Sequence, residues 1–127
     1  MRIGDLSKRT GVSPRSLRYY EEQGLLTTSR SDAGQRHYSE ADVERVALIR
    51  QLFDAGMSSR VIASVLPCVD TPTDPDITES AFVTMMHERD RIDADIAHLL
   101  KTRDALDGLT GINRRYWAEL TSAPVPG

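Results

Sequence analysis

The sequence predicts a mainly α-helical protein, in which a small helical domain with one β-hairpin precedes a single long helix. Three observations support this prediction. Short amphipathic segments with helix-capping residues fill the first half of the chain. A polar stretch at residues 27–38, with a glycine near its centre, interrupts them as a hairpin does. The second half carries a heptad pattern between positions 82 and 106 that is apolar except at two arginines, Arg89 and Arg103.

Two helices are predicted at the start of the chain, over residues 4–10 and 14–23. The first is closed by a glycine, which tolerates the left-handed conformation that ends many helices. Ser13 and Pro14 mark the start of the second. A serine hydroxyl accepts a bond from a free backbone N–H, and proline has no N–H to satisfy.

The hairpin and two further helices follow. Its turn is predicted near Gly34. Ser39 begins the third helix, and Asp42 three residues later completes a capping box. Ser58 begins the fourth, which Pro67 is expected to end.

Proline and glycine positions divide the chain further. Three prolines mark a linker before the long helix, which Asp76 and Glu79 are expected to cap and Gly108 and Gly111 to end. The predicted segments are a domain over 1–70, a Pro-rich linker over 71–76, a long helix over 77–108 and a short tail over 109–127.

The long helix carries six apolar residues and two arginines separated alternately by three and four positions, which is the a/d pattern of a coiled coil. About 30 residues of helix extend ~45 Å, too far for the small domain to cover, so we predict pairing with a second copy. The alternative is a helix that packs back on its own domain. The predicted dimerisation residues are Phe82, Met85, Arg89, Ile92, Ile96, Leu99, Arg103 and Leu106.

The composition excludes several classes of protein. The chain has 127 residues, of which 39% are hydrophobic and 28% charged, as in a globular domain. One cysteine, Cys68, rules out an internal disulfide and leaves too few thiolates for a typical zinc site. There is no apolar run of roughly 20 residues and no signal-like start, so we expect a cytoplasmic protein with no membrane partner.

No nucleophile–base pair, phosphate-binding loop or ligand cluster is evident, so the sequence predicts a protein that is not an enzyme, with no metal and no cofactor. The distribution of charged residues indicates a binding function instead. Residues 1–38 carry seven Lys or Arg against four acids, whereas residues 61–127 carry six against eleven. A basic first part favours an anionic partner such as nucleic acid.

The order of several motifs is specific. The run IGDLSKRTGVS at residues 3–13 resembles the start of MerR-family transcriptional regulators, and LRYYEEQGLL at 17–26 strengthens the resemblance. GQRHYS at 34–39 is similar to the wing of the family, with Gln35 where tyrosine is frequent. The resemblance covers about residues 2–66.

The resemblance implies a winged helix-turn-helix domain followed by a dimerisation helix in an antiparallel coiled coil. It also implies binding of the homodimer to double-stranded promoter DNA with an overlong spacer. Bending and untwisting of that DNA then lets RNA polymerase engage both promoter elements.

Candidate DNA-binding residues follow from this placement, since the second helix of a helix-turn-helix enters the major groove with its N-terminal part at the bases. Arg15 and Arg18 can read guanine or hold phosphates. Ser13 and Ser16 suit a phosphate oxygen, and Tyr19 can donate its hydroxyl to the DNA backbone.

The wing and the fourth helix supply further candidates. Arg30 and Arg36 bring charge to the phosphates or minor groove, Tyr38 brings a hydroxyl, and Arg60 resembles a phosphate contact of a second wing. For each arginine the alternative is a solvated surface charge.

The tail holds two aromatic residues, Tyr116 and Trp117, which could line a pocket for a small-molecule effector or anchor the tail on the partner subunit. Metal sensors of the family carry cysteines at the start of the dimer helix and after it, where this chain has none. Cys68 is either a half-buried structural residue or a redox thiol.

The leading hypothesis is a dimeric transcriptional regulator that binds a palindromic promoter operator and distorts the DNA. Two alternatives remain. One is an architectural DNA-binding protein, similar to an excisionase, with clustered sites and no effect on polymerase. The other is a small-molecule-binding module whose DNA activity is residual.

Overall fold

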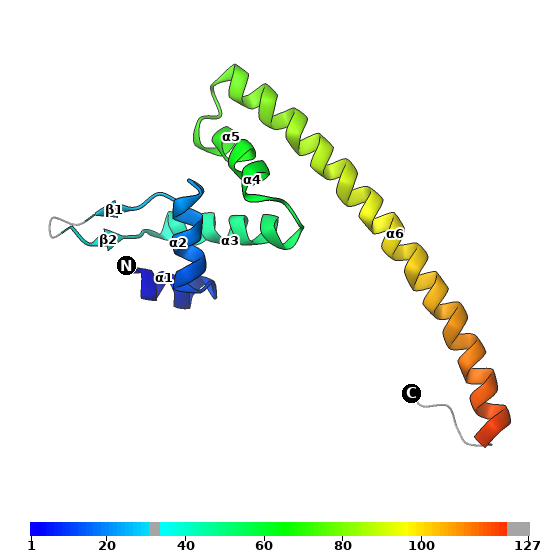
Figure 1. Cartoon of the computed structure of the whole chain (residues 1–127). Helices are drawn as coiled ribbons and strands as arrows, with labels where there is room; N and C mark the ends of the chain where they lie inside the picture. The colour runs from blue at the N-terminus through cyan, green and yellow to red at the C-terminus, as the bar shows by residue number, and fades with distance from the viewer. Residues whose placement is uncertain (31–33, 122–127) are drawn as a thin grey trace. The chain divides into compact units, whose positions relative to one another are not determined.

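The computed structural model describes residues 1–30 and 34–121, except for the side chains of residues 29 and 30. The chain forms two compact units, residues 1–88 and 89–127. The elements in order are α1 (Ile3–Thr10), α2 (Pro14–Glu22), β1 (Ser29–Arg30), β2 (Arg36–His37), α3 (Glu40–Asp54), α4 (Ser59–Val65), α5 (Pro67–Asp70) and α6 (Pro75–Thr121) (Figure 1). The predicted fold class is confirmed.

The predicted starts of α2 and α3 are present. The Ser13 hydroxyl accepts a hydrogen bond from the backbone N–H of Ser16 at 3.1 Å, and Pro14 is the first residue of α2. At α3 the Asp42 carboxylate accepts a bond from the backbone N–H of Ser39 at 2.7 Å, which forms the capping box. These caps satisfy amides that the helix itself leaves without a partner, and so fix where each helix begins.

One hydrophobic core lies in the first unit, where α1, α2, α3 and α4 contribute their apolar faces. The ring of Tyr20 stacks on Phe53 with centroids 5.5 Å apart. Burial of each large apolar side chain contributes about 1.5–3 kcal/mol. The core residues are Leu6, Val12, Leu17, Tyr20, Leu25, Leu26, Tyr38, Val46, Ile49, Ile62 and Leu66.

The hairpin forms where the sequence predicts it. The two short strands are antiparallel, with Ser29 opposite His37 and Arg30 opposite Arg36. Directly after β2, Tyr38 is 1% exposed, and its backbone N–H donates to the carbonyl oxygen of Met1 at 2.7 Å. One end of the hairpin is therefore fixed in the core.

The start of α6 differs from the prediction. Asp74, rather than Asp76, accepts hydrogen bonds from the backbone N–H groups of Asp76 and Ile77, at 3.0 and 3.2 Å. Pro75 is the first helical residue. This is the same cap-then-proline arrangement as at α2, and the three-proline linker concealed it. Pro67 likewise begins the short α5 instead of leading directly into a linker.

The predicted end of the long helix is wrong. α6 continues through Gly108 and Gly111 to Thr121, so residues 109–121 are helical and do not form a separate tail. A glycine inside a helix costs only about 1 kcal/mol relative to alanine, and a helical stop needs a glycine with positive φ. Neither Gly108 nor Gly111 has a positive φ.

Within the described residues, no helix is both long and apolar enough to cross a bilayer.

Candidate nucleic-acid interface

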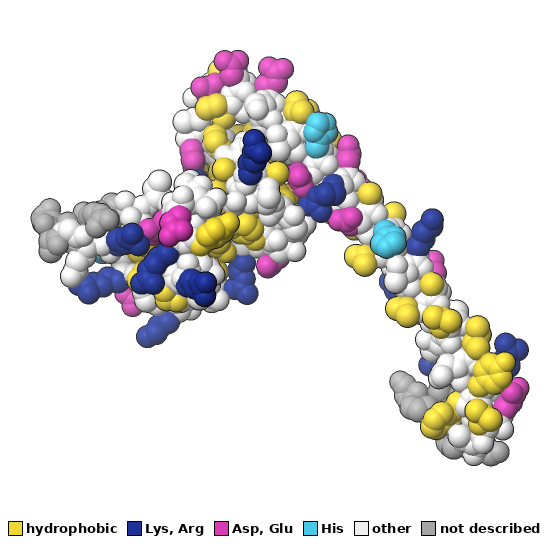
Figure 2. Space-filling model, viewed as in Figure 1, with side chains coloured by type: hydrophobic (Ala, Val, Ile, Leu, Met, Phe, Trp, Pro, Cys, Tyr) yellow, Lys and Arg dark blue, Asp and Glu magenta, His cyan; other side chains and the backbone are white. Residues whose placement is uncertain are grey.

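Helix α2 presents a cationic face to solvent. Leu17 and Tyr20 point into the core, so the helical period leaves Arg15, Arg18 and Tyr19 on the opposite side, where all three are exposed. Figure 2 shows Lys and Arg side chains gathered over the part of the first unit formed by the hairpin, α1 and α2. This face can receive a polyanion, as the charge distribution predicts.

The N-terminus of α2 lies on the same surface. The Ser13 hydroxyl donates to the Ser16 hydroxyl at 3.1 Å while it caps the helix. Ser13 is exposed and Ser16 is half-buried. The positive end of the helix dipole is thus accessible to a phosphate oxygen, and Ser13 orders the turn that presents it.

A half-buried carboxylate connects the wing to α2. Glu21 in α2, whose side chain is 13% exposed, forms an ion pair with Arg36 in β2 at 3.1 Å. The Tyr38 hydroxyl donates a hydrogen bond to the same carboxylate. Burial, and then the bond to Glu21, raise the pKa of Tyr38 to about 12, because both favour the neutral phenol.

This arrangement changes the role expected of Tyr38. The side chain lies in the core, so it does not offer a surface hydroxyl to DNA as the sequence analysis expects. It supports Glu21, which in turn holds Arg36. The Arg36 side chain is 40% exposed and remains on the surface.

The other candidates lie on separate elements. Arg60 is exposed in the first turn of α4. The side chain of Arg30, in β1, lies outside the described residues. Arg9 in α1 binds Glu40 of α3 through two hydrogen bonds of 2.7 and 2.8 Å, and this pairing raises the pKa of Arg9 and lowers that of Glu40. Arg9 therefore links α1 to α3.

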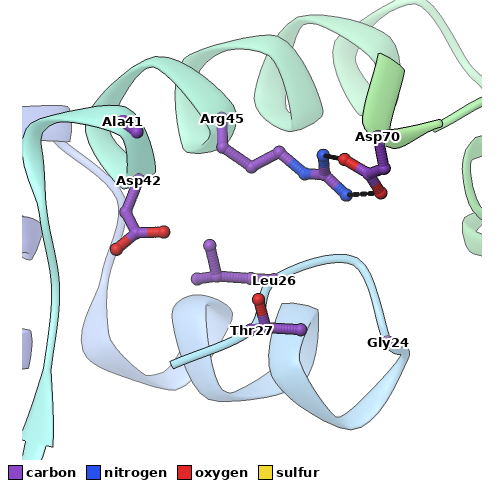
Figure 3. Close-up of a pocket in the computed structure, with 7 residues that line it drawn as sticks. All are labelled: Gly24, Leu26, Thr27, Ala41, Asp42, Arg45 and Asp70. Atoms are coloured by element: carbon purple, nitrogen blue, oxygen red, sulfur yellow. Dashed lines mark hydrogen bonds and ion pairs between the residues drawn. The ribbon is translucent and has the colours of Figure 1, made fainter. Parts of the chain in front are cut away.

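A pocket of about 260 Å³ lies between the segment after α2 and helices α3 and α5. Figure 3 shows Arg45 reaching across it from α3 to Asp70 of α5. Arg45 binds the Asp70 carboxylate at 2.5 and 3.2 Å and donates to the Leu25 carbonyl oxygen at 3.0 Å. The volume is below the range of usual small-ligand sites, so the ion pair serves to attach α5 to the domain.

The predicted dimerisation residues lie along α6 and are largely exposed in the single chain. Leu99 is 65% exposed and Phe82 58%, whereas Ile92 is half-buried. Tyr116 and Trp117 lie in the last turns of the same helix and are exposed as well.

Sequence reasoning missed two residues that organise the site, Glu21 and Arg45. Glu21 lies four residues after Leu17 and directly after Tyr20, so the helical period places it beside the buried face of α2. That signal was available. The bond between Arg45 and Asp70 joins residues 25 positions apart, and no local pattern indicates it.

Comparison with known proteins identifies the family to which the first part of the chain is similar. Residues 1–67 match the MerR HTH family regulatory proteins. The chain is 36% identical over 112 residues to the HTH-type transcriptional activator SoxR homolog of Chromobacterium violaceum, covering 86% of this chain and 73% of that protein. It is 31% identical over 109 residues to the transcriptional regulator ZntR of Escherichia coli K12, with coverages of 85% and 77%.

Other relatives are longer. The nodulation protein NolA of Bradyrhizobium elkanii is 34% identical over 110 residues, or 86% of this chain but only 46% of NolA. The chain thus spans less than half the length of that relative.

Two solved structures share the fold. A MerR family regulator from Listeria monocytogenes has a TM-score of 0.76 at 23% identity, and covers 95% of this chain and 86% of its own. HiNmlR, a MerR family regulator lacking the sensor domain and bound to promoter DNA, has a TM-score of 0.73 at 22% identity, with coverages of 99% and 96%. The chain belongs to the MerR family of helix-turn-helix, DNA-binding transcriptional regulators, which are not enzymes.

Proposed function

We propose that this protein acts as a homodimer that binds an inverted-repeat operator in a promoter, with α2 of each subunit in the major groove. The observation that carries the proposal is the exposed face of Arg15, Arg18 and Tyr19 on α2, the second helix of the helix-turn-helix. A second helix in this position reads base edges with its N-terminal part.

The residues of α2 make two kinds of contact with DNA, to the bases and to the backbone. Arg15 and Arg18 carry planar guanidinium groups, which bind the O6 and N7 atoms of guanine in a bidentate manner. Ser13, Ser16 and the helix N-terminus bind a phosphate, and the Tyr19 hydroxyl donates to the DNA backbone. Base contacts set the sequence, and backbone contacts set the position of the helix.

The wing and α4 hold the flanking backbone. Arg36, Arg30 and Arg60 bind phosphates or the adjacent minor groove. Glu21 and Tyr38 limit the rotamers of Arg36, because the ion pair at 3.1 Å holds the guanidinium in place. Since each phosphate contact releases counterions, each should add about one unit to the salt slope of binding.

The dimer gives the operator its symmetry, because two copies related by a two-fold axis read two half-sites in opposite orientations. We infer that the bound dimer bends and untwists the promoter and so changes its use by RNA polymerase. Two relatives support this role, one named as a transcriptional activator and the other described as bound to promoter DNA.

Selection of bound duplexes from a random DNA pool at moderate salt tests the proposal. We expect recovery of an inverted repeat with a fixed half-site spacing. Recovery of no motif, together with binding that vanishes as salt rises, would mean that the protein contacts only the DNA backbone. That result would overturn the proposal in favour of an architectural role.

A further inference from the structure

One side chain, Arg45 of α3, joins two segments that are distant in the sequence. Its Nε donates a hydrogen bond to the Leu25 carbonyl oxygen at 3.0 Å, and its two terminal nitrogens bind the Asp70 carboxylate at 2.5 and 3.2 Å. The Arg45 side chain is only 21% exposed. Because a guanidinium is planar and carries its donors in a fixed fork, one group holds both segments in a defined geometry.

Leu25 is attached directly to the end of α2. Its backbone N–H donates to the carbonyl oxygen of Tyr20, within α2, at 2.9 Å. Gly24 has the positive φ, 73°, that this kind of helix end requires. The Leu25 side chain is fully buried in the core. A group that binds the Leu25 carbonyl oxygen is therefore held in place relative to the helix that carries the candidate base-reading residues.

Asp70 is attached in a similar way to the start of α6. It is the last residue of α5, and hydrogen bonds from Thr71 to the Pro67 carbonyl oxygen at 2.8 Å and from Asp74 to the Thr71 carbonyl oxygen at 3.2 Å follow it. Asp74 then caps α6. Ala81, near the start of α6, is fully buried, so this part of the helix packs within the first unit. Holding Asp70 therefore holds the start of α6.

The connection between α2 and α5 depends on this one arginine. The pocket that Arg45 crosses separates α5 from the segment after α2, so packed side chains do not fill this space (Figure 3). Asp42 also lines the pocket, but its carboxylate caps α3 at Ser39. Among the residues that the structure describes, no other hydrogen bond or ion pair joins α5 to α1, α2 or α3.

The position of α2 relative to the start of α6 matters in a dimer. Where two subunits are joined through α6, this position in each subunit sets the distance and angle between the two copies of α2. One base pair more or less between the half-sites moves a half-site by about 3.4 Å and turns it by ~35°. A rigid subunit accepts one spacing, whereas a subunit in which α5 can shift accepts neighbouring spacings as well.

We propose that Arg45 is a positioning residue that sets the half-site spacing of the operator, because it fixes the start of α6 relative to α2 through Asp70 and Leu25. It acts through these two residues and not by contact with DNA. The inference rests on the homodimer and the operator of the proposed function, and adds to them the residue that determines spacing. Recognition of bases within each half-site stays with α2.

Operators with altered spacers test this assignment. The selected inverted repeat is prepared with its own spacing and with one base pair added or removed, beside a duplex that holds a single half-site. Asp70→Asn keeps the shape of the side chain and removes the charge that Arg45 binds. By fluorescence anisotropy, discrimination between the selected and the altered spacings should fall at least about threefold, since each subunit loses a partly exposed ion pair. Affinity for the single half-site should stay within about twofold, because the contacts to DNA are unchanged.

A second acid of the same domain provides the matched control. Asp54 pairs with Arg50 at 4.0 Å within α3, so Asp54→Asn makes the same charge change without separating two elements, and should leave the spacing preference unchanged. Arg45→Met should reduce discrimination further than Asp70→Asn, because the Leu25 carbonyl oxygen also loses its donor. Circular dichroism and sedimentation check that each variant is folded and dimeric. If Arg45→Met unfolds, Asp70→Asn still decides, since 51% of that side chain is exposed.

The results separate this inference from the function on which it rests. An unchanged spacing preference in Asp70→Asn would overturn the role of Arg45. Equal weakening on the single half-site and on every operator would overturn it too, because Arg45 would then support only the fold of the domain. If the unmodified protein bound all three operators equally well, the operator-binding homodimer of the proposed function would be wrong, and this inference with it.

Discussion

The first unit and the helix that extends beyond it use apolar residues in opposite ways. In residues 1–88 the large apolar side chains of four helices meet in one core, and Leu6, Leu17 and Ile49 are fully buried. Beyond Ala81, no described residue of α6 is buried, although its apolar residues follow an equally regular spacing. Helical periodicity thus shows that a face will be covered, but not whether the same chain covers it.

The largest expected effect lies in the core. Leu17→Ala should lower the free energy of unfolding of the first unit by about 2–5 kcal/mol, because it leaves a cavity at a fully buried site. Denaturant unfolding followed by circular dichroism measures this. Leu99→Ala, measured at concentrations where the chain is monomeric, is the matched control, because Leu99 is 65% exposed. An equal loss in both variants would mean that α6 packs on the domain of its own chain.

A charge among the predicted dimerisation residues of α6 should weaken the dimer without unfolding the first unit. Leu99→Asp should raise the dimer dissociation constant at least about a hundredfold, since it brings an unpaired carboxylate into an apolar layer. Sedimentation velocity measures this, and thermal unfolding should show an intact first unit. Ala97→Asp, on the outer side of the same helix, is the control. A Leu99→Asp chain that stays dimeric would contradict the assignment of Leu99 to the dimer interface.

A substitution on α2 should weaken operator binding and leave the dimer intact. Arg18→Ala should weaken specific operator binding by about 1–3 kcal/mol and leave dimerisation unchanged, because Arg18 is exposed on the face of α2 opposite the core. Fluorescence anisotropy on the selected operator and on a scrambled duplex measures the change. Lys8→Ala removes an exposed charge from α1 and serves as the control. Equal weakening on both duplexes would make Arg18 a backbone contact only.

Much of this fold was predictable because its signals are local. The Ser13 cap, the Ser39 capping box and the hairpin each depend on a few neighbouring residues and are present as predicted. The end of α6 was not, because Gly108 and Gly111 resemble helix stops, yet neither adopts the positive φ of a helix-ending glycine and α6 continues to Thr121.

In the candidate site, too, local features could be predicted from the sequence and contacts between distant residues could not. Its exposed arginines on α2 follow from the helical period, so their place on the surface could be read from the sequence. The support of Arg36 by Glu21 and Tyr38 depends on how β2 meets α2. Residues 15 or more positions apart meet there, and a pattern of spacing says nothing about such a contact.

The smallest expected effect concerns this support. Tyr38→Phe should lower the free energy of unfolding by about 1 kcal/mol, because Glu21 loses its hydrogen-bond donor. In the unchanged protein the pKa of Tyr38 is raised to about 12, so the folded state favours the protonated phenol. That stability is fully present below the ordinary tyrosine pKa of about 10 and is lost as the pH rises from there to about 12.

Unfolding measured as a function of pH checks this. The stability of Tyr38→Phe should depend less on pH between about 10 and 12 than that of the unchanged protein. Tyr19→Phe is the control, since Tyr19 is exposed. The same alkaline slope in Tyr38→Phe would show that the Tyr38 hydroxyl does not couple to folding.

The central claim is that two chains, joined through α6, place two copies of α2 on one operator. The most direct test is native mass spectrometry of the protein with the selected operator duplex. We predict a complex of two chains per duplex for the unchanged protein, and no such complex for Leu99→Asp at the same concentration. One chain per duplex with undiminished affinity would contradict the account.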